Sequence, residues 1–204
     1  AFRQARERIT IVSPYFVPGE KGVEVFRELR ERGITVRILT NALSSNDVPA
    51  VHAGYANYRR PLLEAGVELF ELNANHLQGR PIRQSLVGTK STASLHAKAF
   101  VFDRESVFIG SLNLDPRSIT ENSEIGVLFR SPEVAGRMVD WFDSSVDSIA
   151  YRLILRDSGN KTREIRWYGL GADGQVEYIR DPGASIWLRM GVSLLSLLPV
   201  EPLL

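Results

Sequence analysis

The sequence of 204 residues contains no cysteine, which excludes disulfides and thiolate metal sites. No run reaches the roughly 18 uninterrupted apolar residues of a membrane-spanning helix, and no signal peptide opens the chain. The net charge is only +1, so no overall field draws the protein to nucleic acid or acidic lipid. Internal repeats and low-complexity segments are also missing. With 44% hydrophobic and 24% charged residues, the composition is that of a globular protein of one domain or slightly more.

The first third of the chain alternates between strand-like and helix-like patterns. β-Branched and apolar residues predict strands at 8–17, 34–40 and 67–72, and helical spacing predicts helices at 20–32 and 47–65. Strands joined by crossover helices run parallel. The sequence therefore predicts an α/β fold with a mixed, largely parallel sheet and helices on both faces.

Residues 73–94 show no periodicity and predict a long surface loop. Arg80, Arg83 and Lys90 make this loop basic, with no acidic residue between positions 79 and 98. The run indicates either a solvated loop or an anion site. The elements predicted after it are strands at 95–102, 106–109 and 124–130 and a helix at 132–148.

The pattern of predicted elements changes after residue 150 to short strands and an apolar tail. We therefore divide the chain into a main domain, 1–150, and an extension, 151–204. Short strands are predicted at 151–155, 163–170 and 176–179. The apolar tail, 184–204, predicts a terminal helix packed on the domain. Because it combines Trp187 and Arg189 with many leucines, a membrane-surface anchor is the alternative.

One motif carries the chemistry of this chain, H-x-K-x4-D-x6-G-S-x-N, formed by His96, Lys98, Asp103, Ser111 and Asn113. Alternate residues of a strand share a face, so His96 and Lys98 are predicted on one side and Asp103 on the other. Histidine can attack phosphorus or shuttle a proton, while ammonium, hydroxyl and amide groups donate to phosphate oxygens. The set fits phosphoryl chemistry, and Asp103 fits a structural role in the turn.

Glu124 opens a predicted apolar strand, where an unpaired carboxylate is costly. Pairing with His96 would satisfy the carboxylate and fix the imidazole tautomer, whereas the alternative is a surface glutamate at a strand end. The other histidines, His52 and His76, lack a lysine two residues later. His52 is expected either to line the pocket from a loop or to have a structural role.

The motif resembles the signature of the phospholipase D superfamily. Segments 11–19, 47–55, 113–118 and 194–199 also resemble the C-terminal half of bacterial cardiolipin synthases of the C type, which are phospholipase D-like transphosphatidylases. The resemblance implies that 1–150 is a catalytic lobe with one motif and that neither a metal nor another cofactor is needed. It implies catalytic roles for His96, Lys98, Asp103 and Glu124 and substrate-binding roles for Ser111 and Asn113.

A working site in that family uses two motifs, one from each lobe, and this chain has one. We expect the companion to be a missing N-terminal lobe or a second identical chain; the start at Ala1, without methionine, favours the missing lobe. The expected function is the second lobe of a phosphatidyltransferase that acts on phospholipids through a phosphohistidine, inactive as an isolated monomer.

Two alternative functions stay open. The first is a phospholipase D-type phosphodiesterase or dimeric nuclease, although near-zero net charge and the apolar tail disfavour nucleic acid as a partner. The second is a non-catalytic lobe that binds phospholipid headgroups. The expected location is the periphery of a bacterial cell membrane, with contact through residues 184–204 and the fragment itself soluble.

Overall fold

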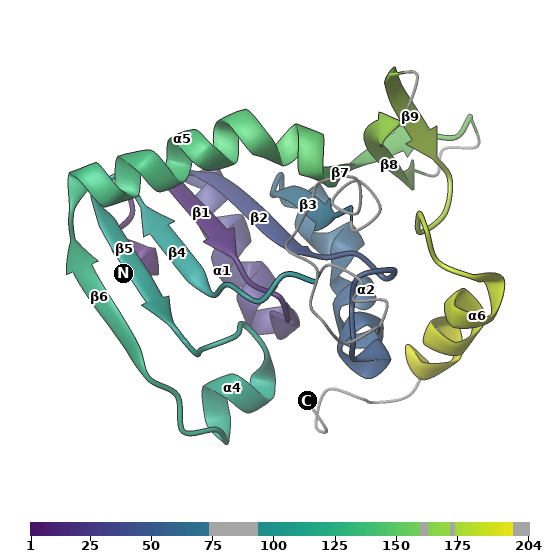
Figure 1. Ribbon diagram of the computed structural model, residues 1–204, viewed down its shortest axis with the longest axis horizontal. Helices are drawn as coiled ribbons and strands as arrows, with labels where there is room; N and C mark the ends of the chain where they lie inside the picture. The colour runs from purple at the N-terminus through teal and green to yellow at the C-terminus, as the bar shows by residue number, and fades with distance from the viewer. Residues whose placement is uncertain (74–93, 160–162, 172–173, 198–204) are drawn as a thin grey trace, which may run out of the picture.

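The computed structural model describes residues 1–73, 94–159, 163–171 and 174–197 (Figure 1). The predicted basic loop with Arg80, Arg83 and Lys90, together with His76, lies outside the described residues. So does the end of the tail after residue 197. Among the described residues, no helix is both long and apolar enough to cross a membrane.

Nine strands form one sheet in the order β6-β5-β4-β1-β2-β3-β7-β8-β9. The strands are β1 (Arg8–Val12), β2 (Thr35–Asn41), β3 (Glu68–Leu72), β4 (Ala99–Phe102), β5 (Ser106–Gly110), β6 (Gly126–Arg130), β7 (Ala150–Asp157), β8 (Arg163–Gly171) and β9 (Gly174–Tyr178). The mixed α/β class is confirmed, and the crossover helices make β1, β2 and β3 parallel as predicted.

The expectation that most neighbouring strands are parallel is wrong. Of the eight strand pairs in the described residues, only β1–β2 and β2–β3 are parallel. Three of the antiparallel pairs, β4–β5, β7–β8 and β8–β9, are joined by short connections, such as residues 103–105 between β4 and β5. Connections this short permit only antiparallel pairing, because a parallel neighbour needs a long crossover.

Helices cover both faces of the sheet, as the sequence predicted. In Figure 1, α5 (Pro132–Ile149) crosses one face, while α1 (Gly19–Glu31) and α2 (Pro49–Glu64) lie on the other. The other helices of the described residues are the short turn η1 (Phe2–Gln4), α4 (Pro116–Thr120) and α6 (Ile186–Leu195). Helix α4 was not predicted, although Asp115 before Pro116 is a recognisable start signal: its carboxylate accepts the Ser118 N–H at 2.8 Å.

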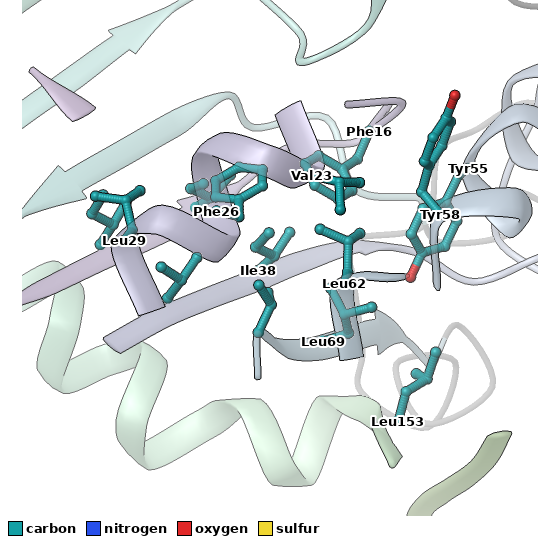
Figure 2. Close-up of a cluster of buried hydrophobic side chains, with 14 of the residues drawn as sticks. Phe16, Val23, Phe26, Leu29, Ile38, Tyr55, Tyr58, Leu62, Leu69 and Leu153 are labelled. Atoms are coloured by element: carbon teal, nitrogen blue, oxygen red, sulfur yellow. The ribbon is translucent and has the colours of Figure 1, made fainter. Parts of the chain in front are cut away.

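The alternation of side chains along the central strands produces two apolar cores. Val23, Phe26 and Leu29 of α1 pack with Leu62 of α2 on the strand residues of one face (Figure 2). On the other face, Phe142 and Val146 of α5 pack on Val12, Leu39 and Phe70. Successive residues such as Ile38 and Leu39 therefore enter opposite cores, which fixes the register of the central strands.

The segment after residue 150 continues the same sheet, because β7 pairs antiparallel with β3. Helix α6 then packs on α2 through a small cluster that includes Leu43, Ala53 and Val192. The predicted terminal helix packed on the domain is thus confirmed for the described part of the tail.

A buried ionic cluster connects this C-terminal segment to α2 and β3. Arg59, in α2, places Nε 2.8 Å from Oε1 of Glu71 and Nη2 2.6 Å from Oδ1 of Asp181. Trp167 donates its indole N–H to the second oxygen of Glu71 at 2.9 Å. His52 is completely buried in α2, 2.8 Å from Nη2 of Arg59, so it has a structural role.

The charges of this cluster stabilise one another. Burial lowers the pKa of His52, and the charge of Arg59 lowers it further, so the imidazole is neutral near pH 7. Burial raises the pKa of Asp181, but the guanidinium of Arg59 and the bond from His52 outweigh that effect. The pKa of Asp181 consequently lies well below its ordinary value. The ion pair between this carboxylate and Arg59 connects two distant parts of the sequence.

At the opposite edge of the sheet, β6 lies largely in the open. The exposed fractions of Val127 and Leu128 are 61% and 56%, although both are apolar. β6 pairs only with β5 among the described strands. This edge lies beside the motif, since β5 leads directly into Ser111.

Candidate active site

The two halves of the motif meet at one end of the β4–β5 hairpin. Residues 94–98 lead into β4, and residues 111–115 follow β5. The N–H of Gly110 donates to the carbonyl of Lys98 at 3.3 Å, which places Lys98 beside Ser111. Asp103 is at the other end of this hairpin, in the turn between the two strands.

The strand predicted at 95–102 begins only at Ala99, because a side chain takes the place of a strand partner. Asn41, at the end of β2, is buried and accepts the N–H of Leu95 at 2.9 Å. Its amide nitrogen lies 3.3 Å from the carbonyl oxygens of both Leu95 and Pro14. Asn41 therefore fixes the entrance to the motif, and the sequence analysis missed it because a single asparagine at a strand end carries no distinctive pattern.

His96 and Lys98 lie next to each other on the open side of this segment. The ammonium of Lys98 donates to the carbonyl oxygen of His96 at 3.2 Å. The side chain of His96 is exposed and makes no hydrogen bond or ion pair with any residue that the structure describes. An exposed imidazole beside an ammonium is free to reach a phosphate from solvent.

Glu124 contacts Ser111, and the expected pair with His96 is not formed between these described residues. The hydroxyl of Ser111 donates to Oε2 of Glu124, and Asn122 donates to the other oxygen at 3.4 Å. Two bonds between Ser111 and Ile125 hold this arrangement: the Ser111 N–H donates to the carbonyl of Ile125 at 2.8 Å, and the Ile125 N–H donates to the side-chain hydroxyl of Ser111 at 3.0 Å. The strand β6 starts at Gly126, so Glu124 precedes it and turns towards Ser111.

These contacts stabilise the ionised form of Glu124. The hydrogen bond from Ser111 lowers the pKa of this carboxyl, with smaller effects from Asn122, Ser118 and the charge of Lys98. Glu124, Ser111 and Lys98 thus form one polar group at the end of the hairpin, with His96 beside it.

Asn113 lies in the loop after Ser111 with part of its side chain buried. Its amide oxygen Oδ1 is inaccessible to solvent and has no hydrogen-bond partner in the described part of the chain. A buried polar atom without a partner is costly unless a ligand satisfies it. Because the oxygen and nitrogen of an amide are assigned rather than seen, the group can accept or donate.

Asp103 has the contacts of a group that fixes a turn. Its Oδ1 accepts the N–H groups of Arg6, Glu7 and Arg8 at 3.1, 2.9 and 3.0 Å. Asp103 and Arg104 both have positive φ, 53° and 55°, and Asp tolerates this conformation better than most residues. Asp103 ties the β4–β5 turn to the start of β1, on the far side of β4 from His96 and Lys98.

A second group of polar residues connects the segment after β1 to the loop after Ser111. Ser13 donates its hydroxyl to the carbonyl of Tyr15 at 2.7 Å and accepts the N–H of Leu114 at 3.4 Å. Tyr15 donates to Asp47 at 2.8 Å. Burial raises the pKa of Tyr15 to about 12, with the hydrogen bond to Asp47 and the charges of Asp47 and Asp115 adding to the effect. Single polar residues in loops gave no signal for this group.

The described residues contain no cluster of three or more histidine, cysteine or carboxylate side chains that could hold a metal ion. The site is instead a set of hydrogen-bond donors and one imidazole, gathered at the end of a hairpin that the sheet and Asn41 hold in place.

This fold and site define a phospholipase D-like domain. Residues 1–146 match the family described as the cardiolipin synthase, phospholipase D-like domain, and the chain belongs to this family within the phospholipase D superfamily.

Three known proteins illustrate the similarity. Cardiolipin synthase C of Escherichia coli K12 is 41% identical over 198 residues, which are 97% of this chain and 41% of that protein. The chain thus spans less than half the length of this relative. The structure of phosphatidylserine synthase from Haemophilus influenzae Rd KW20 is similar over 74% of this chain and 35% of that one, with a TM-score of 0.54 and 20% identity. Nuc from Salmonella typhimurium, a phospholipase D family member, is similar over 71% of this chain and 80% of that one, with a TM-score of 0.52 and 19% identity.

Proposed function

We propose that this chain is the second lobe of a cardiolipin synthase-like phosphatidyltransferase. The observation that carries the proposal is the exposed imidazole of His96 beside Lys98, Ser111 and Glu124, in a chain of this family. Donors gathered around one nucleophile suit a phosphodiester, whose non-bridging oxygens carry the negative charge.

The proposed reaction has two displacements at phosphorus. In the first, a ring nitrogen of one histidine forms a P–N bond while the bond from phosphorus to the leaving alcohol breaks. A second histidine, from the companion lobe, gives that alcohol its proton. In the second, the hydroxyl of an acceptor phospholipid loses its proton to the second histidine, forms a P–O bond and breaks the P–N bond. His96 takes one of these two roles, and the companion histidine takes the other.

The neighbouring groups have distinct proposed roles. Lys98 stabilises the charge on the phosphate oxygens, and Ser111 donates to them when it is released from Glu124. The unpartnered amide of Asn113 binds either a phosphate oxygen or the acceptor hydroxyl. Glu124 orients the histidine in the assembled site, for which it must exchange its present partner. Asp103 supports the reaction through the turn, without touching the substrate.

The companion is proposed to be a first lobe with its own motif or, in its absence, a second copy of this chain. One lobe supplies one histidine, whereas the two displacements need one on each side of phosphorus. The isolated monomer is therefore expected to have no measurable turnover. Because the substrates are phospholipids, the enzyme is proposed to work at the periphery of a bacterial membrane.

The test uses the complete natural protein that contains these residues, with phosphatidylglycerol labelled at the phosphate. His96→Ala is expected to lower the transfer rate by about three orders of magnitude and to abolish acid-labile, base-stable label on the protein if His96 is the nucleophile. Lys98→Ala is expected to lower the rate strongly, whereas Lys21→Ala, an exposed lysine on α1, serves as the matched control with the wild-type rate.

Other outcomes distinguish the rival functions. Release of phosphatidic acid without transfer to phosphatidylglycerol indicates a hydrolase. Salt-sensitive cleavage of DNA by a stable dimer indicates a nuclease. Binding of vesicles with no label transfer and no effect of His96→Ala indicates a headgroup-binding lobe. Turnover by the purified monomer of this chain, abolished by His96→Ala, would contradict the two-lobe proposal.

A further inference from the structure

Helix α6 has two apolar stripes, and only one of them is used inside the protein. Leu188, Val192 and Leu195 face the cluster that joins α6 to α2. The other stripe, at positions i, i+3 and i+7, consists of Trp187, Met190 and Leu194, whose exposed fractions are 77%, 57% and 67%. A large tryptophan and two long aliphatic side chains in solvent are unusual for a surface helix, whose outer face is normally polar.

The exposed stripe borders a hollow in the surface of about 850 Å³, lined mostly by apolar atoms. Gly191 opens this hollow, because a Cβ added there would meet no atom within 4 Å. Ile186 and Leu197 extend the apolar surface at its two ends. The hollow is therefore shaped by a helix that presents aliphatic groups to solvent.

The charges around the hollow are cationic. Arg180 and Arg189 line it, together with Asp181. Asp181 is already neutralised by the 2.6 Å contact with Arg59. Arg189 donates to the carbonyls of Asp181 and Ala184 at 3.2 and 2.7 Å, bonds that leave its positive charge uncompensated. Arg180 is exposed and has no hydrogen bond or ion pair within the described residues.

We infer that the outer stripe of α6 docks the protein on the surface of a bilayer that contains anionic phospholipid. A tryptophan, aliphatic side chains and flanking arginines are the composition of an interfacial helix, which buries its apolar side at the headgroup boundary. At ten residues α6 is about 15 Å long, so it lies in the interface and does not span it. A second copy of this chain fits less well, because its α6 surface carries the same arginines and its Asp181 is already paired with Arg59.

The docking helix is tied to the domain at both of its attachment points. Its inner stripe packs on α2, and the Arg59–Asp181 pair fixes the segment that leads into it. Docking thus places the whole domain at a fixed orientation to the lipid. In the view of Figure 1, α6 lies at the right, beyond α2, and α4, which follows the motif loop, lies at the lower left. The inference rests on the proposed function only in taking phospholipid as the partner.

The test is co-sedimentation of residues 1–204 with vesicles of phosphatidylglycerol and phosphatidylcholine, and with phosphatidylcholine alone. We expect binding to the mixed vesicles, and a decrease of about tenfold or more in Trp187→Ser/Leu194→Ser. Arg180→Ala is expected to weaken binding to the mixed vesicles by about fivefold, without effect on the neutral ones. The matched control is Leu170→Ser/Val176→Ser, which exchanges exposed apolar residues of β8 and β9 and should bind as wild type.

Tryptophan fluorescence locates the contact. Brominated lipid is expected to quench emission in the wild type and in Trp141→Phe, whose residue is also exposed, but not in Trp187→Phe. Circular dichroism checks that each variant is folded. The inference is overturned if wild type stays in the supernatant, if quenching persists in Trp187→Phe, or if the Trp187 and Leu194 changes break a dimer and leave vesicle binding unchanged.

Failure of this inference is separable from failure of the proposed function. Lys21→Ala, on α1, lies outside both α6 and the motif and is expected to bind vesicles and to transfer label as wild type does. Vesicle binding that the α6 variants weaken, without any transfer activity in the complete protein, would refute the transferase and support the docking helix. Transfer activity, with vesicle binding that the α6 variants leave unchanged, would support the transferase and refute the docking helix.

Discussion

Replacing Arg59 by methionine is the most direct test of how the C-terminal segment is held. The change removes the guanidinium and leaves two carboxylates, Glu71 and Asp181, without their cation. Glu71 has an exposed fraction of 0% and retains the bond from Trp167. Removing one partner of a buried ion pair costs about 3 to 5 kcal/mol, because the remaining charge is buried and uncompensated. We expect Arg59→Met to lower the free energy of unfolding by that amount.

The loss should depend on pH in a definite direction. In the wild type the charge of Arg59 lowers the pKa of Asp181, so this carboxyl binds a proton less tightly in the folded state than in the unfolded one. The resulting stabilisation is present above an unfolded pKa of about 3.9 and is lost as the pH falls towards the lowered value. Arg59→Met removes this contribution, so the deficit is expected to be small at low pH and to grow as the pH rises.

The assay is urea unfolding followed by circular dichroism, at about pH 3 and about pH 8, with the midpoint and slope compared. Arg60→Met is the control, because Arg60 is the next residue on α2 and is exposed, with a contact of 3.8 Å to Glu64. It should change stability by no more than about 0.5 kcal/mol. A stability of Arg59→Met equal to that of the control, or a deficit that shrinks as the pH rises, would refute this account of the cluster.

Two further predictions concern residues that support the motif. Asn41→Ala should lower the transfer rate of the complete protein by at least about tenfold with little change in KM for the lipid, because the segment carrying His96 loses its anchor; Asn41→Asp, which keeps the acceptor for Leu95, should recover part of the rate and change its pH profile. Asp103→Ala should destabilise the fold by about 2 to 3 kcal/mol in thermal or urea unfolding, through the lost bonds to three N–H groups, but leave the rate per folded molecule unchanged. A rate defect in Asp103→Ala at full stability would place this residue in the chemistry.

The order of the early elements could be predicted because each has a strong local pattern. Apolar residues alternate in 34–40 and recur at helical spacing in 20–32, and the structure has β2 and α1 there. The strands at 95–102 and 106–109 were also predicted, and the structure pairs β4 and β5, which are close in sequence, as a hairpin. Local pattern and local structure agree wherever neighbours in sequence make the contacts.

These misses involve contacts between residues that are not neighbours in the sequence. The strand predicted at 95–102 is short because Asn41 takes the backbone groups of Leu95. Glu124 contacts Ser111, next to the backbone bond from the Ser111 N–H to the carbonyl of Ile125. The ionic cluster joins distant residues, such as Arg59 and Asp181, which are 122 positions apart, and each looks like an ordinary surface charge in the sequence. No periodicity encodes such contacts.

The exposed outer edge of β6 has a consequence for the behaviour of this domain in solution. Among the described strands, its outer amides and carbonyls have no partner, and the strand has no charged residue before Arg130. With Val127 and Leu128 exposed as well, this edge can pair with a strand of another chain. Concentrated samples should therefore self-associate through this strand first. Leu128→Lys is expected to prevent the association, because a lysine on an edge strand disfavours pairing with another chain.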